Sequence, residues 1–424
     1  MKRRGAIALL VLAALLLAAL LLLRWLMRAD VLGPMVLDRA GSALGLEITA
    51  DAFDYRLRGT PQLVARGVVA REPGAAGPVL RADRVLVSVP WSTLRARGAD
   101  LTIERIELDA PVVELAAFQH WWSARPPGEG PPPTLRGGLH VVDGRVSGDA
   151  WRVDDIALDL PEFAADRALR VHARGRYVAG TLQAPFDLHA SMTRPSADAG
   201  VGITGEISPQ GDDWRLPSSI VLSTHLQGPP PGPPGAMDDA GLRLRQLRLS
   251  SRARYLSGTG VQPFVFGFAA EGVLADGGLR LLPAALTLRG QELIPRLRAR
   301  GAIDFADELQ LALQGELADW PEAWPALPPP LGASQAPLPF ELEYRGTLAL
   351  TDPIALRLER DGAGFDGRLR VPELAAWIDA GADGSPLPPL RGRIEAPRID
   401  ISGATLHGVE IELEDDVVTE GVIP

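Results

Sequence analysis

The 424-residue sequence contains no cysteine and no asparagine, and its single lysine is Lys2. Without cysteine the chain has neither disulfides nor thiolate metal ligands, so it carries no mark of the redox state of its compartment. Without asparagine, two-residue β-hairpin turns must rely on Asp-Gly. Hairpins are therefore expected at the four Asp-Gly pairs that lie between apolar runs: Asp143-Gly144, Asp276-Gly277, Asp361-Gly362 and Asp366-Gly367.

Glycine and proline are abundant, with 45 and 38 residues. Together they make up more of the chain than the ~12% of ordinary proteins and less than the ~25–30% of disordered ones. Pro-rich stretches, which are typical of loops and linkers, divide segments in which apolar and polar residues alternate as in half-buried strands. The sequence predicts four β modules, at residues 31–125, 134–228, 235–330 (with a helical insert) and 337–424.

The N-terminal stretch is the clearest signal. Residues 5–23 carry no charge, and as a helix they span ~28 Å, close to the ~30 Å hydrocarbon core of a bilayer. This run is longer than the core of a cleaved signal peptide, and no small-residue cleavage site follows it. Residues 1–30 are therefore predicted to form a cytoplasmic tip and one transmembrane anchor, with the membrane residues Ile7, Leu10, Leu16, Leu20, Leu23 and Trp25.

Charge is divided unevenly between this anchor and the rest of the chain. The net charge of the whole chain is −10, and residues 1–30 carry a net charge of +4. The remainder therefore has a net charge of −14. The basic residues Lys2, Arg3 and Arg4 favour a cytoplasmic N-terminus, with the remainder on the other side of the membrane. An acidic remainder repels nucleic acid, so no nucleic-acid partner is expected.

An apolar pattern recurs in which two polar or small residues interrupt the alternation once. Because this interruption would swap the apolar face, a β-bulge is expected near Glu104-Arg105 and another near Arg245-Gln246. Bulges make sheets coil. The predicted fold is mainly β: a transmembrane helix, then an elongated, coiled antiparallel β-sheet groove with a few short helices. The candidate groove residues are Leu101, Ile103, Ile106, Leu108, Ile156, Leu158, Leu160, Leu242, Leu244, Leu247, Leu249, Val409, Ile411 and Leu413.

Helices are predicted at few places, namely residues 32–44, 91–97, 316–320 and 373–377. The last two share an acidic-Leu-Ala start, a Trp and a Leu-Pro ending, and they look like one unit used twice. Trp320, Trp324 and Trp377 are expected to pack against the sheet. Trp121-Trp122 is open to two interpretations, a partly buried pair in a helical turn or a docking point for a membrane or a protein.

No catalytic signature is found. The sequence has no GxSxG, Walker, HExxH or EF-hand motif, and its one GxGxxG match, residues 362–367, precedes an alternating run and favours a glycine-rich hairpin. Acidic pairs such as Asp154-Asp155 face opposite sides of a strand or lie at turns. The histidines, which are far apart in sequence, are expected to be structural: His120, His140, His172, His189, His225 and His407. We expect no enzyme, no cofactor and no metal site.

The chain resembles the AsmA family of Gram-negative inner-membrane proteins, whose larger relatives include the translocation and assembly module subunit TamB. The resemblance is carried by the order of degenerate segments: the anchor, then residues 43–48, 63–72, 80–89, 91–94, 101–115, 139–146 and 390–416. It implies a β-groove that holds phospholipid acyl chains, a periplasmic body on an inner-membrane anchor, and a role in outer-membrane lipid homeostasis.

Two alternatives stay open. The apolar stripes suit an ordinary two-sheet core as well as an open groove, because both bury one face of a strand. A protein of this fold that carries phospholipid toward the outer membrane is one reading. The other is a non-enzymatic assembly or secretion accessory protein that binds a periplasmic or outer-membrane protein partner.

Overall fold

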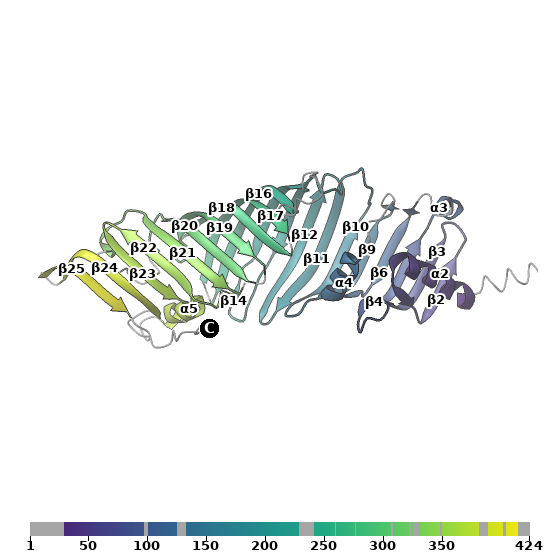
Figure 1. The fold of residues 1–424 in the computed structure, drawn as a ribbon, viewed down its shortest axis with the longest axis horizontal. Helices are drawn as coiled ribbons and strands as arrows, with labels where there is room; N and C mark the ends of the chain where they lie inside the picture. Colours follow the sequence, from purple (N-terminus) through teal and green to yellow (C-terminus); the bar gives the residue numbers. More distant parts are fainter. Residues whose placement is uncertain are drawn as a thin grey trace, which may run out of the picture. The chain divides into compact units, whose positions relative to one another are not determined.

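The structure is a computed structural model that describes residues 29–96, 101–124, 133–228, 241–258, 260–275, 277–306, 308–321, 324, 327, 331–347, 350–380, 389–401 and 404–413. The chain divides into two compact units, Met1–Pro195 and Ser196–Pro424. Both are mainly β, as predicted (Figure 1). The predicted anchor lies outside the described residues. Within them, no helix is long and apolar enough to cross a bilayer.

Most strands of unit 1 belong to one large mixed sheet. Its spatial order is β1 and β2 side by side on β3, then β4, then β6 and β7, then β9, β10, β11 and β12. The pairs are antiparallel except where β9 runs parallel to β6 and β7. The bounds are β1 Glu47–Thr49, β2 Ala52–Arg56, β3 Gln62–Arg71, β4 Pro78–Ser88, β6 Arg105–Asp109, β7 Val112–Glu114, β9 Leu139–Ser147, β10 Arg152–Leu160, β11 Leu169–Ala179 and β12 Leu182–Met192.

Unit 2 is an antiparallel meander in which most strands pair with the next one along the chain. At its start, β15 pairs with both β13 and β16, and the short β14 joins β16. The bounds are β13 Ala199–Ile207, β14 Trp214–Arg215, β15 Ser218–Gln227, β16 Leu242–Ser257, β17 Gly260–Ala275, β18 Gly278–Arg289, β19 Arg296–Phe305, β20 Leu309–Leu317, β21 Leu338–Gly346, β22 Ile354–Arg360, β23 Ala363–Leu369, β24 Leu390–Ile401 and β25 Ala404–Leu413.

The described helices are short: α2 Ala29–Leu44, α3 Trp91–Arg95, α4 Leu115–Ser123, α5 Val371–Ala380 and the 3-10 turn η1 Leu331–Ala333. Three of the four predicted helices are confirmed, within α2, α3 and α5. The prediction for residues 316–320 is wrong, because Glu316 and Leu317 end β20, where Leu317 pairs with Leu297 and Leu338. The two Trp-containing segments are therefore not one unit used twice.

Two of the four Asp-Gly predictions are confirmed. Asp361 and Gly362 form the turn between β22 and β23, with φ of 54° and 79° as a type I′ turn requires. Gly277 lies in the turn between β17 and β18. The other two pairs lie inside strands β9 and β23. Asp143 has a left-handed backbone, with a φ of 54°, but it lies at a β-bulge of β9 and not in a hairpin turn.

The predicted bulge at Arg245-Gln246 is confirmed. The register of β16 shifts by one residue against both neighbours there, and Gln246 has a φ of 52°. The prediction for Glu104-Arg105 is wrong: the strand is interrupted at Glu104. The first piece, β5 (Thr102–Ile103), pairs in parallel with β8 (Thr134–Leu135) in a separate small sheet, and only the second piece, β6, joins the large one.

Further bulges occur where the sequence pattern is looser. Asp155, with a φ of 56°, marks the bulge in β10, and β18 shifts register against β17 and β19 near Leu282. Each bulge keeps the apolar residues before and after it on one face of the sheet, because the extra residue offsets the break in alternation.

Candidate functional site

The candidate site in unit 1 is one face of its sheet. The strand registers place apolar residues directly opposite one another, so that they share a face. One row crosses the sheet from β3 to β12: Ala65, Val85, Leu108, Val141, Leu158, Ala173 and Leu188. We call the side of the sheet that carries this row the apolar face of unit 1.

Unit 2 repeats the arrangement over a longer sheet. A single row of opposed residues runs from β13 to β25 without a charged member: Ile203, Leu222, Leu249, Phe268, Leu286, Ala299, Gly315, Phe340, Leu358, Phe365, Ile394 and Ile411. This side is the apolar face of unit 2.

The face is only half-buried in the first part of unit 2. On β16 the leucines of the apolar face are all partly exposed to solvent, and Ala253 is the only buried residue of that strand. The aromatic rings Phe266 and Phe268 lie stacked along β17, 6.4 Å apart, and both are also half-buried. In a sandwich a second sheet would cover such residues, but the large-sheet strands of each unit belong to a single sheet among the described residues.

The middle of the unit 2 face is closed by the chain itself. The segment after β20 places Trp320, Trp324 and Leu331 against a buried cluster that includes Leu338 and Phe340. This packing confirms the prediction for the two tryptophans. Leu331 and Leu338 are the largest fully buried side chains, each 1% exposed. Apolar contact in this part of the face is therefore intramolecular.

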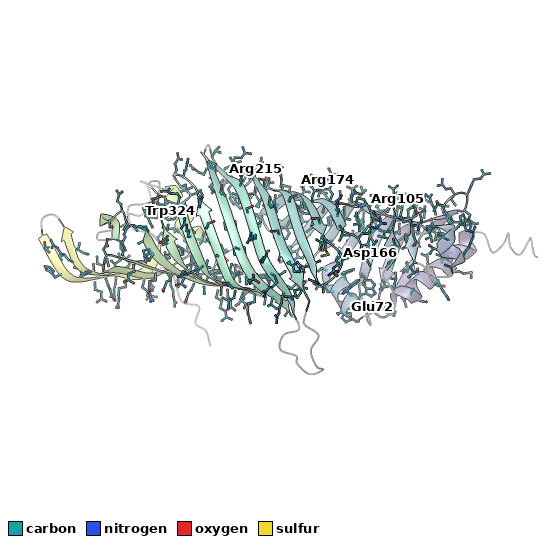
Figure 2. All side chains as sticks on the ribbon, turned by 90° about the horizontal axis from the view of Figure 1, so that it is seen from above. Glu72, Arg105, Asp166, Arg174, Arg215 and Trp324 are labelled. Carbon is teal, nitrogen blue, oxygen red and sulfur yellow. The ribbon has the colours of Figure 1, made fainter. Side chains whose placement is uncertain are left out.

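Polar contacts hold the covering segment in place. The indole Nε1 of Trp324 donates to the carbonyl oxygen of Leu293 at 3.0 Å. Arg360, which is 8% exposed, donates from Nη1 to the carbonyl oxygen of Ala336 at 2.8 Å. Trp324 is labelled in Figure 2. Nearby, Leu374 of α5 packs against the buried residues Tyr344 and Leu369.

In unit 1, helix α4 packs beside β3 and β4. Its residues Phe118 and Trp121 contact the cluster around Ala70, and Trp121 Nε1 donates to the carbonyl oxygen of Leu44 at 2.8 Å. The neighbouring Trp122 is 64% exposed. The predicted pair is thus split between a packed ring and an exposed one.

The predicted groove residues fall into two groups. Leu101 precedes the strands and is 51% exposed, and Ile103 lies in the small β5–β8 sheet. The others lie in strands of the large sheets and carry apolar side chains into the rows or beside them: Ile106 and Leu108 (β6), Ile156, Leu158 and Leu160 (β10), Leu242, Leu244, Leu247 and Leu249 (β16), and Val409, Ile411 and Leu413 (β25).

Sequence reasoning missed the aromatic part of the face. Phe266, Phe268, Phe340 and Phe365 all belong to alternating runs, and they oppose the leucines of neighbouring strands. The recurring Leu/Ile pattern predicts only strands in which the alternation is interrupted. These phenylalanines lie in strands of uninterrupted alternation, and this alternation in the sequence could have identified them.

The opposite side of each sheet is charged. In unit 2 a second row of opposed residues runs Arg300, Gln314, Glu341, Arg357, Asp366, Arg393 and Glu412. Arg357 bonds Asp366 at 2.6 Å and lies 3.6 Å from Glu341. The hydrogen bond that Arg357 donates to Asp366 raises the pKa of the Arg357 guanidinium. Each sheet therefore has one face suited to hydrocarbon and one suited to water.

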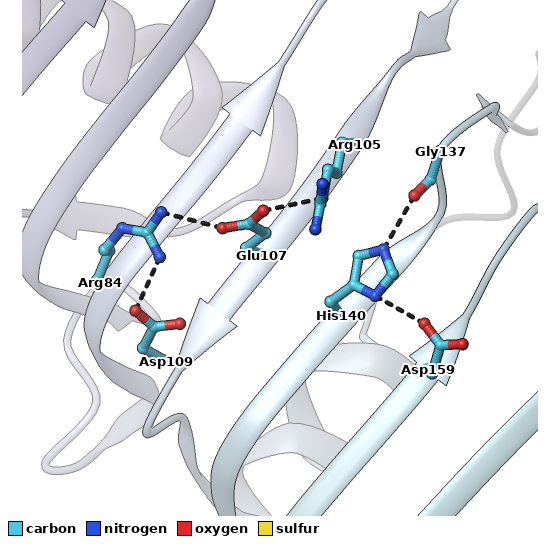
Figure 3. Close-up of polar contacts among 7 residues, drawn as sticks. All are labelled: Arg84, Arg105, Glu107, Asp109, Gly137, His140 and Asp159. Atoms are coloured by element: carbon cyan, nitrogen blue, oxygen red, sulfur yellow. Dashed lines mark hydrogen bonds and ion pairs between the residues drawn. The ribbon is translucent and has the colours of Figure 1, made fainter.

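The charged face of unit 1 begins with a cluster on β4 and β6 (Figure 3). Arg84 donates to Asp109 at 2.8 Å and to Glu107 at 2.9 Å, and Arg105 donates to Glu107 at 2.8 Å. The hydrogen bonds from Arg84 to Asp109 and then to Glu107 raise the pKa of the guanidinium. Figure 2 labels Arg105 and, further along this face, Arg174.

Asp154 is the one buried carboxylate of the described residues, at 7% exposed. Arg145 donates to its Oδ1 and Arg152 to its Oδ2, each at 2.7 Å. Burial alone would raise the pKa of Asp154, but the two arginines outweigh it and hold the pKa below its ordinary value. Through Arg145 of β9, the carboxylate of Asp154 links β9 to β10.

The described residues thus define a class of protein: mainly β, with sheets that are apolar on one face and charged on the other. Comparison with protein-family models, with curated proteins and with solved structures finds no match to this chain.

Proposed function

We propose that the chain is an inner-membrane-anchored periplasmic protein whose apolar faces shield phospholipid acyl chains on their way toward the outer membrane. The observation that carries the proposal is the half-buried apolar row of unit 2, which continues from strand to strand without a charged residue. Neighbouring strands are ~4.8 Å apart, so such a row offers a hydrocarbon strip that lengthens with every strand.

Energetics support a lipid as the occupant. Removing apolar groups from water is worth about 0.8 kcal/mol per methylene, so an acyl chain that covers a dozen methylenes gains about 10 kcal/mol. The same contact would cover half-exposed side chains such as Leu249 and Phe266. Exposed apolar patches of this kind mark interaction sites in soluble domains.

The evidence for the membrane anchor and for the periplasmic location comes from the sequence. Residues 5–23 have the length and polarity of a membrane span, and Lys2, Arg3 and Arg4 favour a cytoplasmic start. The resemblance to the AsmA family supports the periplasmic location and the role in outer-membrane lipid homeostasis. No nucleotide-binding motif was found in the sequence, so we propose that a gradient or a partner gives the flow its direction.

Neighbouring positions on opposite faces provide the test. Leu249→Arg places a charge on the apolar face, whereas Ser250→Arg places the same charge on the other face of the same strand. Phospholipid extracted from the detergent-free body, residues 31–424, is measured by mass spectrometry. We expect lipid in the wild type and in Ser250→Arg, and at least a fivefold loss in Leu249→Arg with an unchanged circular dichroism spectrum.

Equal lipid content in the two variants would contradict the proposal. A lipid-free body with a stoichiometric protein bound to it would support the alternative, an assembly or secretion accessory protein.

A further inference from the structure

The charged face of unit 1 brings together two histidines and a carboxylate that are separated in the sequence. His172 lies on β11, and Asp187 and His189 lie on β12. One potential ligand atom from each of the three lies within 4.8 Å of the other two. The two imidazole rings are stacked, with centroids 4.2 Å apart and an interplanar angle of 12°.

The register of the β11–β12 hairpin explains why these three side chains lie close together. β11 and β12 pair without a shift, so His172 is directly opposite His189, and Arg174 is directly opposite Asp187. Asp187 and His189 are two residues apart on one strand and so share a face. Nε2 of His172 is 2.7 Å from Oδ1 of Asp187, which shows that the side chains already point toward one another.

We propose that His172, Asp187 and His189 form a binding site for a divalent transition metal, with Zn²⁺ as the ion that fits best. Two imidazole nitrogens and a carboxylate oxygen are ligands that Zn²⁺ takes at 2.0–2.2 Å, and its filled d shell imposes no preferred geometry. Zn²⁺ binds the lone pair of a neutral imidazole nitrogen, so with Nε2 of His172 as the ligand atom the single ring proton resides on Nδ1.

Binding requires only a local adjustment. Tetrahedral ligand atoms lie about 3.3 Å apart at these bond lengths. The stacked rings must therefore turn about their Cβ–Cγ bonds until their nitrogens converge. All three side chains have room to do so, because His172 is only partly buried and the other two are exposed. Three protein ligands leave the fourth position open to water or to a donor from a partner.

The surroundings are close to neutral and suit a cation held by one carboxylate. Asp159 of β10 is directly opposite His172, which adds a second negative charge beside the site. Arg170 and Arg174 flank His172 on its own strand. Since Oδ1 of Asp159 already lies 2.7 Å from Nδ1 of His140, we assign Asp159 no role as a ligand.

Three other His–carboxylate pairs provide the contrast among the described residues. His225 lies 2.8 Å from Asp198, His140 2.7 Å from Asp159 and His120 3.7 Å from Glu72. None of these pairs belongs to a group of three potential ligands within the described ranges. His225→Ala is therefore a matched control, since it removes an exposed imidazole from a carboxylate without touching the proposed site.

The test is calorimetric titration of Zn²⁺ into the full-length chain, purified in detergent without a histidine tag and stripped with chelator. We expect one Zn²⁺ per chain with a micromolar Kd. His172→Ala, His189→Ala and Asp187→Asn should each weaken binding at least tenfold, and His225→Ala should change it less than twofold. Zn²⁺ should also raise the Tm of the wild type and of His225→Ala, but not that of His189→Ala.

Three results would overturn the site: no binding at 100 μM Zn²⁺ (a chosen test concentration, about 100-fold above a micromolar Kd), equal weakening in His225→Ala, or undiminished binding in His189→Ala. A circular dichroism spectrum of each variant checks that the substitution leaves the fold intact.

Discussion

His172 and His189 are directly opposite each other on β11 and β12, with ring centroids 4.2 Å apart, although 16 residues separate them in the chain. Their meeting follows from the hairpin centred on Gly180, whose left-handed backbone, φ 58°, closes the turn. A single register therefore decides both which residues form the proposed metal site and which residues lie on the apolar face of unit 1.

Because of Asp154, the unfolding free energy of unit 1 should depend on pH. Because its pKa is lowered in the folded state, its contribution is present above the ordinary carboxyl pKa and is lost as the pH falls through the lower folded value. Asp154→Asn should cost about 2 kcal/mol at pH 7, since two charge-assisted hydrogen bonds weaken. Urea denaturation at pH 7 and below pH 4 measures this cost.

The neighbouring Asp155 is the control for that experiment. Its bond to Arg176, 2.6 Å long, lies on the surface with the Asp155 side chain 68% exposed. Asp155→Asn should change the unfolding free energy by less than about 0.5 kcal/mol. A larger effect from Asp155 than from Asp154 would show that burial does not set the strength of these pairs.

Two phenylalanines should distinguish the covered part of the unit 2 face from the open part. Phe340, which is 8% exposed, lies in the buried cluster, so Phe340→Ala should cost about 3–5 kcal/mol. Phe266 is half-buried, and Phe266→Ala should cost about 1–2 kcal/mol in the absence of lipid. Equal costs in chemical denaturation would mean that both parts are closed.

The bulge in β16 depends on a backbone conformation that few side chains tolerate. Gln246 has a φ of 52°, so Gln246→Val, which places a β-branched side chain in the left-handed region, should cost about 1–2 kcal/mol. Gln246→Gly keeps the extra residue and relaxes the positive φ, so it should leave stability nearly unchanged. Thermal unfolding compares the two variants, and equal Tm values would contradict this account of the bulge.

The sequence allowed some of these features to be predicted and not others. The interrupted alternation predicted the bulge at Gln246 correctly, because a period of two cannot otherwise keep Leu244 and Leu247 on one face. The same pattern misled at Glu104, where the interruption separates two strands of different sheets. Only knowledge of the partner strands distinguishes the two outcomes.

Tertiary packing overrode local preference at Leu317. Its segment has helix-forming residues, yet Leu317 is 7% exposed between Leu297 and Leu338, and strand pairing on both sides outweighs a propensity of tenths of a kcal/mol per residue. The meeting of His172 with His189 was missed for another reason. The turn at Gly180 has no Asp-Gly pair, so no tight hairpin was predicted there.

The most direct test of acyl-chain shielding is photo-crosslinking in living cells with the full-length chain. A photoreactive phenylalanine replaces Phe266, which lies on the half-buried part of the apolar face on β17, or its neighbour Val265, which lies on the charged side between Arg252 and Arg289. We predict a phospholipid adduct, detected by mass spectrometry of the purified protein, at Phe266 and none at Val265. Adducts at both positions in equal amount, or at neither, would contradict the account.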